Sequence, residues 1–157
     1  MTNRLSLPLG LALLLVVAAC TSVPYTGRRQ LRLIGPEEEA RMGLEAWREV
    51  LGKATVVRGT PEAEMVETVG RRIAAATGER YAWEFALLEG DDTVNAFCLP
   101  GGKVAVYTGL LPVTQTPDGL AAVLGHEVAH AVAHHWAERV SQELIAKGVM
   151  SAAGASL

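Results

Sequence analysis

Residues 120–135 read LAAVLGHEVAHAVAHH, and we expect the fold to be organised around them. A helix turns about 100° per residue, so His126 and His130 lie on one face, one turn apart. Two imidazoles placed in this way can bind one metal ion, and zinc accepts neutral imidazole nitrogen as a ligand. Glu127 stands beside them, where a carboxylate can take a proton from a metal-bound water that attacks a carbonyl. The pattern predicts a catalytic zinc site with His126 and His130 as ligands and Glu127 as general base.

The flanking sequence supports this interpretation, although five residues with three fixed positions also occur by chance. Thr116, Pro117 and Asp118 are an N-cap, a proline at the first helical position and an acidic residue in the first turn. A buried glutamate between two buried histidines would be costly without a partner such as a metal. The apolar residues expected to bury the motif are Leu120, Val123, Leu124, Val128, Ala131 and Val132.

The first 19 residues are typical of a secretion signal. Arg4 precedes an apolar run from Leu9 to Ala19, which is too short to span a bilayer as a stable helix. The end of this run, Val17-Ala18-Ala19-Cys20, resembles a bacterial lipobox, in which the cysteine becomes the lipidated first residue of the mature protein. We therefore expect a lipid anchor on Cys20. The alternative is an ordinary signal peptide cut near Ala19, with Cys20 as a plain thiol.

The residue after the cysteine is Thr21 and not Asp, and the lipobox resemblance then implies sorting to the outer membrane. The expected location is the bacterial cell envelope, lipid-anchored and facing the periplasm.

Charge argues against nucleic acid as a partner. Without residues 1–19 the chain has 13 basic and 17 acidic residues, a net charge near −4, and no strong basic concentration. The short cluster Arg28, Arg29 and Arg32 follows the expected anchor, where it contacts lipid head groups or forms a solvated surface. With Cys20 acylated, Cys98 has no intramolecular partner, and we interpret it as a small core residue and not a nucleophile.

The mature chain begins with an expected tether, residues 20–35, which has no helical period. Pro36 and the acidic residues after it open a predicted helix that runs to about Val50. Pro61 opens a second helix, which Gly78 ends. Both helices are predicted to be packing elements.

Three predicted strands then lead into the motif helix, at Trp83–Leu88, Val94–Leu99 and Lys103–Tyr107. Pro100-Gly101-Gly102 is a tight connection suited to a β-hairpin between the last two strands. We expect an α+β fold in which helices and a small antiparallel sheet pack on the motif helix. An exposed edge strand of such a sheet can hold an extended peptide by main-chain hydrogen bonds.

Four segments in this order resemble the Oma-like, HtpX-like and Ste-type zinc metallopeptidases. They are TGRRQL at 26–31, NAFCLPGG at 95–102, VYTGL at 106–110 and LAAVLGHEVAHAVAHHWAERVSQ at 120–142. Bacterial members of that group include periplasmic lipoproteins engaged in envelope protein quality control. The resemblance implies a zincin-like fold, His126 and His130 as zinc ligands and Glu127 as general base. It also implies that Asn95, Ala96 and Phe97 form part of the substrate-binding edge.

The third zinc ligand of that group is a Glu on a later helix, several tens of residues beyond the motif. Only 27 residues follow His130 in this chain. We therefore expect residues 36–157 to be the N-terminal portion of a peptidase domain, with two of its three ligands.

No residue after the motif is a good third ligand on sequence grounds. His134 would lie about 12 Å from His126 along a straight helix, too far to share the ion. A metzincin arrangement fails because Ala133 and Trp136 occupy the positions that need glycine and histidine. We expect the remaining candidates to lie around the site or on the surface of the same helix or its continuation: His134, His135, Glu138 and Glu143.

Two hypotheses follow. The first is a zinc-dependent endopeptidase that hydrolyses misfolded or misassembled envelope proteins. The second is a non-catalytic envelope lipoprotein whose incomplete domain binds client proteins through its edge strand, with zinc weak or absent. The presence or absence of the third ligand separates them.

Overall fold

The computed structural model describes residues 20–23 and 26–154, and the chain divides into two compact units. One unit is Gly35–Trp136, and the other joins the described residues up to Ile34 with the described residues from Ala137 onward. The predicted signal segment, residues 1–19, lies outside the described residues.

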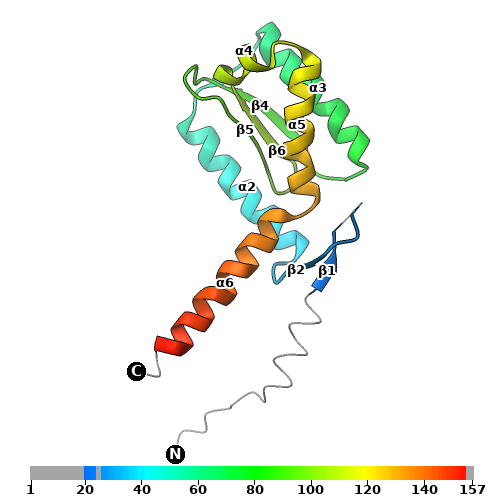
Figure 1. The fold of residues 1–157 in the computed structure, drawn as a ribbon. Coiled ribbons are helices and arrows are strands. Elements are labelled where there is room, and N and C mark those ends of the chain that lie inside the picture. The colour runs from blue at the N-terminus through cyan, green and yellow to red at the C-terminus, as the bar shows by residue number, and fades with distance from the viewer. Residues whose placement is uncertain (1–19, 24–25, 155–157) are drawn as a thin grey trace, which may run out of the picture. The chain divides into compact units, whose positions relative to one another are not determined.

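The unit Gly35–Trp136 contains a four-stranded sheet and its helices (Figure 1). In chain order the elements are α2 (Pro36–Lys53), β3 (Val56–Val57), α3 (Pro61–Thr77), β4 (Glu84–Leu88), β5 (Ala96–Leu99), β6 (Lys103–Tyr107), the 3₁₀ turn η1 (Thr108–Leu110), α4 (Leu111–Thr114), α5 (Pro117–Val132) and the start of α6 (His135–Gly154). The α+β fold class is confirmed, as are the two predicted packing helices and the three predicted strands.

Helix α3 begins and ends where the local signals place it. In α3, the Thr60 side chain accepts a hydrogen bond from the Ala63 N–H at 3.2 Å, and Pro61 follows in the first turn. Gly78 ends the helix with a φ of 71°, a left-handed conformation that glycine adopts without a steric penalty.

The sheet is mixed, so the prediction of three antiparallel strands was wrong in one pairing. Strand order is β3-β4-β6-β5. The hairpin of β5 and β6 is antiparallel, as predicted, with Gly101 and Gly102 at positive φ in its turn. However, β4 pairs in parallel with β6, with Phe85 opposite Val104. The chain between β4 and β5 reaches the far edge of the sheet, and β6, the most buried strand, takes the central place.

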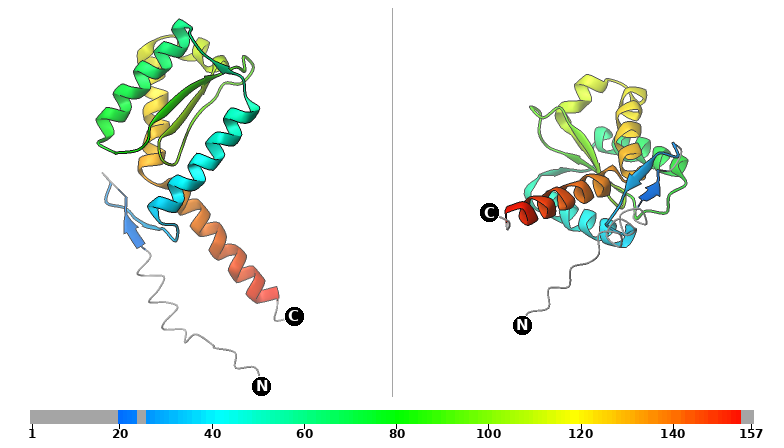
Figure 2. Two further views of the ribbon diagram at one scale, coloured as in Figure 1. Left: turned by 180° about the vertical axis from the view of Figure 1, so that it is seen from behind. Right: turned by 60° about the horizontal axis from the view of Figure 1, so that its bottom comes forward.

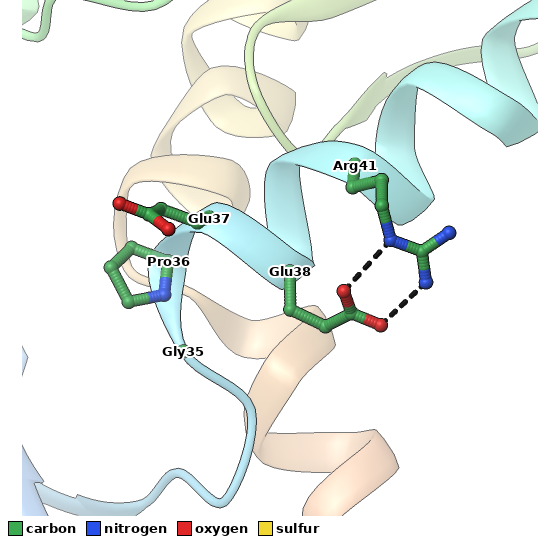
Figure 3. Close-up of a pocket in the computed structure, with 5 residues that line it drawn as sticks. All are labelled: Gly35, Pro36, Glu37, Glu38 and Arg41. Carbon is green, nitrogen blue, oxygen red and sulfur yellow. Dashed lines mark hydrogen bonds and ion pairs between the residues drawn. The ribbon is translucent and has the colours of Figure 1, made fainter.

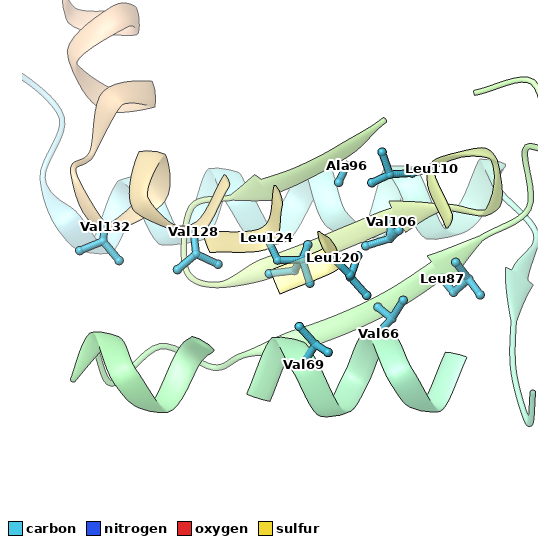
Figure 4. Packing of buried hydrophobic residues seen from close by; sticks show 11 residues of the cluster. Val66, Val69, Leu87, Ala96, Val106, Leu110, Leu120, Leu124, Val128 and Val132 are labelled. Atoms are coloured by element: carbon cyan, nitrogen blue, oxygen red, sulfur yellow. The ribbon is translucent and has the colours of Figure 1, made fainter. Parts of the chain in front are cut away.

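Helices cover both faces of this sheet (Figures 1 and 2). Helices α3 and α5 lie side by side over one face, and Figure 4 shows their side chains meeting those of the strands. That core cluster contains Val66, Val69, Leu87, Ala96, Val104, Val106, Leu110, Leu120, Leu124, Val128 and Val132. On the other face Trp47 of α2 packs with Ala86, Leu88 and Ala105. Because both faces are buried, the strands are apolar at nearly every position and not only at alternate ones.

A polar cluster links α2 to the sheet. Glu84 accepts hydrogen bonds from Trp47 Nε1 and from Lys103 Nζ, both at 2.8 Å, and Lys103 Nζ also donates to the carbonyl of Ala82. The Lys103 side chain is almost fully buried. Its hydrogen bond, with that of Trp47, lowers the pKa of Glu84, so the carboxylate stays charged and satisfies the buried ammonium group.

The second unit contains a β-hairpin where the sequence predicted an irregular tether. Strands β1 (Cys20–Ser22) and β2 (Arg29–Leu31) pair antiparallel. Gly27 takes a positive φ in the connection, and the Val23 N–H donates to the Arg28 carbonyl at 2.8 Å. Strands of three residues are too short for a period-two pattern to stand out in the sequence.

Residues of α6 bind this N-terminal segment within the second unit. The Arg28 guanidinium makes two hydrogen bonds to the Glu138 carboxylate, at 2.8 and 2.5 Å. The Ser141 hydroxyl accepts a hydrogen bond from the Leu33 N–H at 2.9 Å. Arg28, which the sequence placed in a basic cluster, is therefore engaged with a carboxylate of its own chain.

Candidate metal centre

Helix α5 presents the histidines on its solvent-exposed side. Its start is the predicted one, with the Thr116 side chain accepting a hydrogen bond from the Gly119 N–H at 3.1 Å. The apolar residues of this helix face the core, where Leu120, Leu124 and Val128 are at most 2% exposed. His126 and His130 lie on the opposite side and are exposed, and Glu127 is half-buried. The expectation of two buried histidines was therefore wrong, because the apolar residues cover one face of the helix and not its circumference.

The two histidine side chains converge. Nε2 of His126 lies 3.0 Å from Nε2 of His130, and the rings meet edge to face with centroids 4.5 Å apart. Two imidazole nitrogens that share a tetrahedral zinc ion at about 2.0–2.1 Å lie about 3.3 Å from each other. A small rotation of either ring reaches that separation, and neutral imidazole suits zinc. The pair fits a metal ion as two of its ligands.

Glu127 lies on the β5 side of α5. Burial and, secondarily, the charge of Glu127 raise the pKa of the Cys98 thiol to about 12. Cys98 belongs to β5 and packs against the core cluster that α5 completes. Because its charge contributes to this shift, the Glu127 carboxylate lies within electrostatic range of Cys98 in β5. The half-buried thiol itself is held in its neutral form, in agreement with its interpretation as a core residue.

The three residues expected to bind substrate take different environments. Strand β5 is at the edge of the sheet, as the interpretation requires. Asn95 is exposed just before the strand, whereas Ala96 is buried in the core. Phe97 is half-buried on the opposite face, with its ring 6.4 Å from that of Tyr107. Any contribution of Ala96 and Phe97 to substrate binding would therefore come from the backbone of the edge strand.

The motif helix ends sooner than predicted. Helix α5 stops at Val132, and His134 adopts a φ of 54° before α6 begins at His135. The sequence predicted one straight helix through His126, His134 and the later residues. This prediction was wrong, because the helix is interrupted at His134. No glycine or proline occurs between Ala131 and Trp136, so the usual signals of a helix end are missing.

This turn brings together side chains that sequence reasoning did not connect. Nδ1 of His134 lies 2.8 Å from Oε2 of Glu39, a buried residue of α2. Nδ1 of His135 lies 2.6 Å from Nδ1 of His130. The spacing of five residues between His130 and His135 is not a neighbour relation on a helix, so only the turn creates this contact.

A third ligand is not placed beside the pair. Within residues 20–23 and 26–154, no group of three or more His, Cys, Asp or Glu side chains is arranged to hold a metal ion. Glu138 is bound to Arg28 and Glu143 to Arg139, at 3.3 Å in the second case. The carboxylates that follow the motif are thus engaged in ion pairs.

Two surface pockets among the described residues lie away from this pair. One is at the start of α2 and is lined by Gly35, Pro36, Glu37, Glu38 and Arg41, where Arg41 binds Glu38 at 2.5 and 2.8 Å (Figure 3). A second, of about 400 Å³, is lined by residues of α2, β3, α3 and β4, among them Trp47 and Glu84. Neither of these two pockets includes a residue of the motif.

Comparison with known proteins gives the family. Residues 61–157 match the model of peptidase family M48. The chain is 40% identical over 139 residues to the mitochondrial metalloendopeptidase OMA1 of Schizosaccharomyces pombe, covering 86% of this chain and 41% of that protein. It is 31% identical over 151 residues to human OMA1, covering 87% and 29%. It is 29% identical over 122 residues to the beta-barrel assembly-enhancing protease of Yersinia pestis, covering 77% and 25%.

The chain spans at most about two fifths of the length of these relatives. None of the helices described here has both the length and the apolar character needed to cross a bilayer. The convergence of the two histidines on α5, the sheet beside it and the matched family model agree with the resemblance seen in the sequence: the chain belongs to peptidase family M48.

Proposed function

We propose that this protein is a zinc-dependent endopeptidase of the bacterial envelope that hydrolyses misfolded or misassembled proteins. The observation that carries the proposal is the convergence of His126 and His130 through their Nε2 atoms, with Glu127 beside them, in a chain of a metallopeptidase family. The relatives that share this segment are named metalloendopeptidases or proteases.

The residues divide the chemistry between them. His126 and His130 would hold the ion through Nε2, which leaves coordination positions for a further ligand, water and substrate. A bound zinc ion lowers the pKa of water and polarises the peptide carbonyl. Glu127 accepts the proton of the attacking water and delivers it to the departing amine nitrogen as the carbon–nitrogen bond breaks. The Glu127 carboxylate is only half-buried, so water and substrate can reach it.

The edge strand indicates the form of the substrate. Strand β5 can add an extended peptide to the sheet by main-chain hydrogen bonds, with Ala96 and Phe97 in the strand and Asn95 just before it. Main-chain recognition requires an unfolded segment and depends little on the side chains of the substrate. Both properties suit a protease that removes misassembled chains. The name of the Yersinia pestis relative, a beta-barrel assembly-enhancing protease, favours envelope proteins as the substrates.

The proposed location is the periplasmic face of the outer membrane, with a lipid on Cys20 as the anchor. The support is the lipobox-like sequence before Cys20. Cys20→Ala should move the protein from the membrane fraction to the soluble periplasmic fraction. Membrane association that persists in this variant would contradict the lipid anchor.

The test of the mechanism is Glu127→Gln, made in the protein at the length in which the cell produces it. Glutamine keeps the size of the side chain but accepts no proton, so cleavage of an unfolded protein such as casein should fall about 10²-fold or more while bound zinc is retained. His126→Ala and His130→Ala should lose both zinc and cleavage, because each removes a metal ligand. Glu62→Gln, an exposed change in the first turn of α3, is the matched control.

Casein cleavage by Glu127→Gln at the parental rate would exclude Glu127 as the base. The absence of a third ligand beside the pair among the described residues favours one second candidate, a client-binding protein without catalysis. Binding of unfolded chains by the parent and by Glu127→Gln, with cleavage by neither, would establish that candidate.

A further inference from the structure

The turn between α5 and α6 contains a hydrogen bond to a buried side chain of α2. His134 has a φ of 54°, a left-handed conformation that side chains other than glycine disfavour, and its N–H donates to the Ala131 carbonyl at 3.1 Å. The Glu39 side chain, 4% exposed, binds His134 Nδ1 through Oε2 at 2.8 Å. Oε1 of Glu39 has no hydrogen-bond partner among the described residues, so His134 is the group that satisfies this buried carboxylate. A strained turn tied to a buried carboxylate has one preferred conformation.

The consequence of the turn is the position of His135. Its ring lies 4.8 Å from that of His130, centroid to centroid, and the two Nδ1 atoms are 2.6 Å apart. His130 therefore makes two directed contacts: Nε2 faces His126 and Nδ1 faces His135.

These contacts determine the proton positions in a metal-bound state. An imidazole that binds a metal through Nε2 carries its proton on Nδ1, and that N–H commonly donates to a partner that orients the ring. For His130 the partner in reach is Nδ1 of His135, which then accepts the hydrogen bond and carries its own proton on Nε2.

We propose that His135 is a positioning residue for the metal site: it accepts the hydrogen bond from His130 Nδ1–H and holds His130 Nε2 toward His126. Glu39 and His134 act indirectly, because their contact stabilises the turn that places His135 beside His130. The inference rests on the proposed function, in which His126 and His130 bind the metal.

The experiment measures Co²⁺ affinity and the visible absorption of bound Co²⁺, which reports the coordination geometry and requires no catalysis. His135→Ala should weaken Co²⁺ binding about 10- to 100-fold and change the spectrum, because the ring of His130 loses its orientation. His135→Asn should restore most of the affinity and the parental spectrum, since the asparagine Oδ1 occupies the place of Nδ1 and accepts the same hydrogen bond. Thermal unfolding of the metal-free variants tests whether the fold is intact.

Arg139→Ala is the matched control. It removes an exposed ion pair with Glu143 one turn further along α6 and should leave Co²⁺ affinity unchanged. Equal Co²⁺ affinity in the parent and in His135→Ala would overturn the positioning role of His135 but would not contradict the metal site. Loss of affinity that His135→Asn does not restore would also overturn it. A parent that binds no Co²⁺, or whose binding survives His130→Ala, would refute the proposed function itself.

Discussion

Cys98 and Glu127 interact electrostatically, although Cys98 belongs to β5 and Glu127 to α5. Burial is the larger cause of the raised thiol pKa and the carboxylate charge is the second. The thiol is therefore a reporter for the position of Glu127, independent of metal and of activity.

In a Cys20→Ala background we expect Cys98 to react slowly with iodoacetamide. With a pKa of about 12, on the order of one thiol in ten thousand is ionised at pH 8, and the thiolate is the reactive form. Glu127→Gln should increase the alkylation rate, because it removes a negative charge that opposes ionisation. The rate against pH, followed by mass spectrometry, measures both effects.

The charge-neutralising control is Glu62→Gln, which is not among the groups that shift this thiol and should leave its rate unchanged. Alkylation of Cys98 at the rate of an unperturbed cysteine would mean that the thiol is open to solvent. An equal rate in the parent and in Glu127→Gln would place the carboxylate away from β5.

Among the elements, α2 shows how closely a helix approaches the sheet. A Cβ built on Gly43 would lie 2.1 Å from the carbonyl oxygen of Pro100, in the turn between β5 and β6. The same helix contains Gly52, where a Cβ would meet no atom within 4 Å. The two glycines thus have different reasons to be present: the first permits close packing and the second has no steric role.

Gly43→Ala should destabilise the protein by about 1–3 kcal/mol, because the methyl group and the backbone oxygen cannot both keep their places. Gly52→Ala, on the same helix, should be neutral or stabilising by up to about 1 kcal/mol, since alanine is the better helix former. Urea unfolding curves of the two variants give the comparison. Equal stability of both variants would mean that α2 does not sit on the β5–β6 turn.

Over the whole molecule, every residue of the proposed site belongs to the unit Gly35–Trp136. That unit contains the histidine pair, Glu127, the β5 edge and the turn with Glu39, His134 and His135. The ligands proposed in it are two imidazoles whose Nε2 atoms lie 3.0 Å apart, whereas a catalytic zinc normally has three protein ligands.

We therefore expect weak zinc binding by the 157-residue chain. Dialysis should leave less than one equivalent of zinc, by elemental analysis. Added zinc should raise the unfolding temperature reversibly, because it binds the folded chain in preference to the unfolded one. At a zinc concentration a hundred times the dissociation constant, this binding adds about 2.7 kcal/mol to the free energy of unfolding. EDTA should remove the increase, and His126→Ala should not show it. A tightly held one-to-one zinc would demonstrate a third ligand in the chain.

The sequence alone determined the features that depend on neighbouring residues. Thr116 and Pro117 begin the motif helix, Gly101 and Gly102 form the hairpin turn, and the helical spacing of His126 and His130 sets their convergence. Each depends on contacts within a few residues, where propensity and spacing dominate. The segments that resemble the metallopeptidases also led to the right family.

Only the tertiary structure decided what depends on distant parts of the chain. Apolar strands carry no signal for their partner or direction, so the parallel pairing of β4 with β6 was not predictable from either segment. The end of α5 was missed because the residues around it carry no local stop signal, and the contact made there by His134 is with Glu39, 95 residues away in sequence. The contact of His135 with His130 follows from that turn. A buried carboxylate requires a partner, and its position is known only once α2 is packed against the sheet.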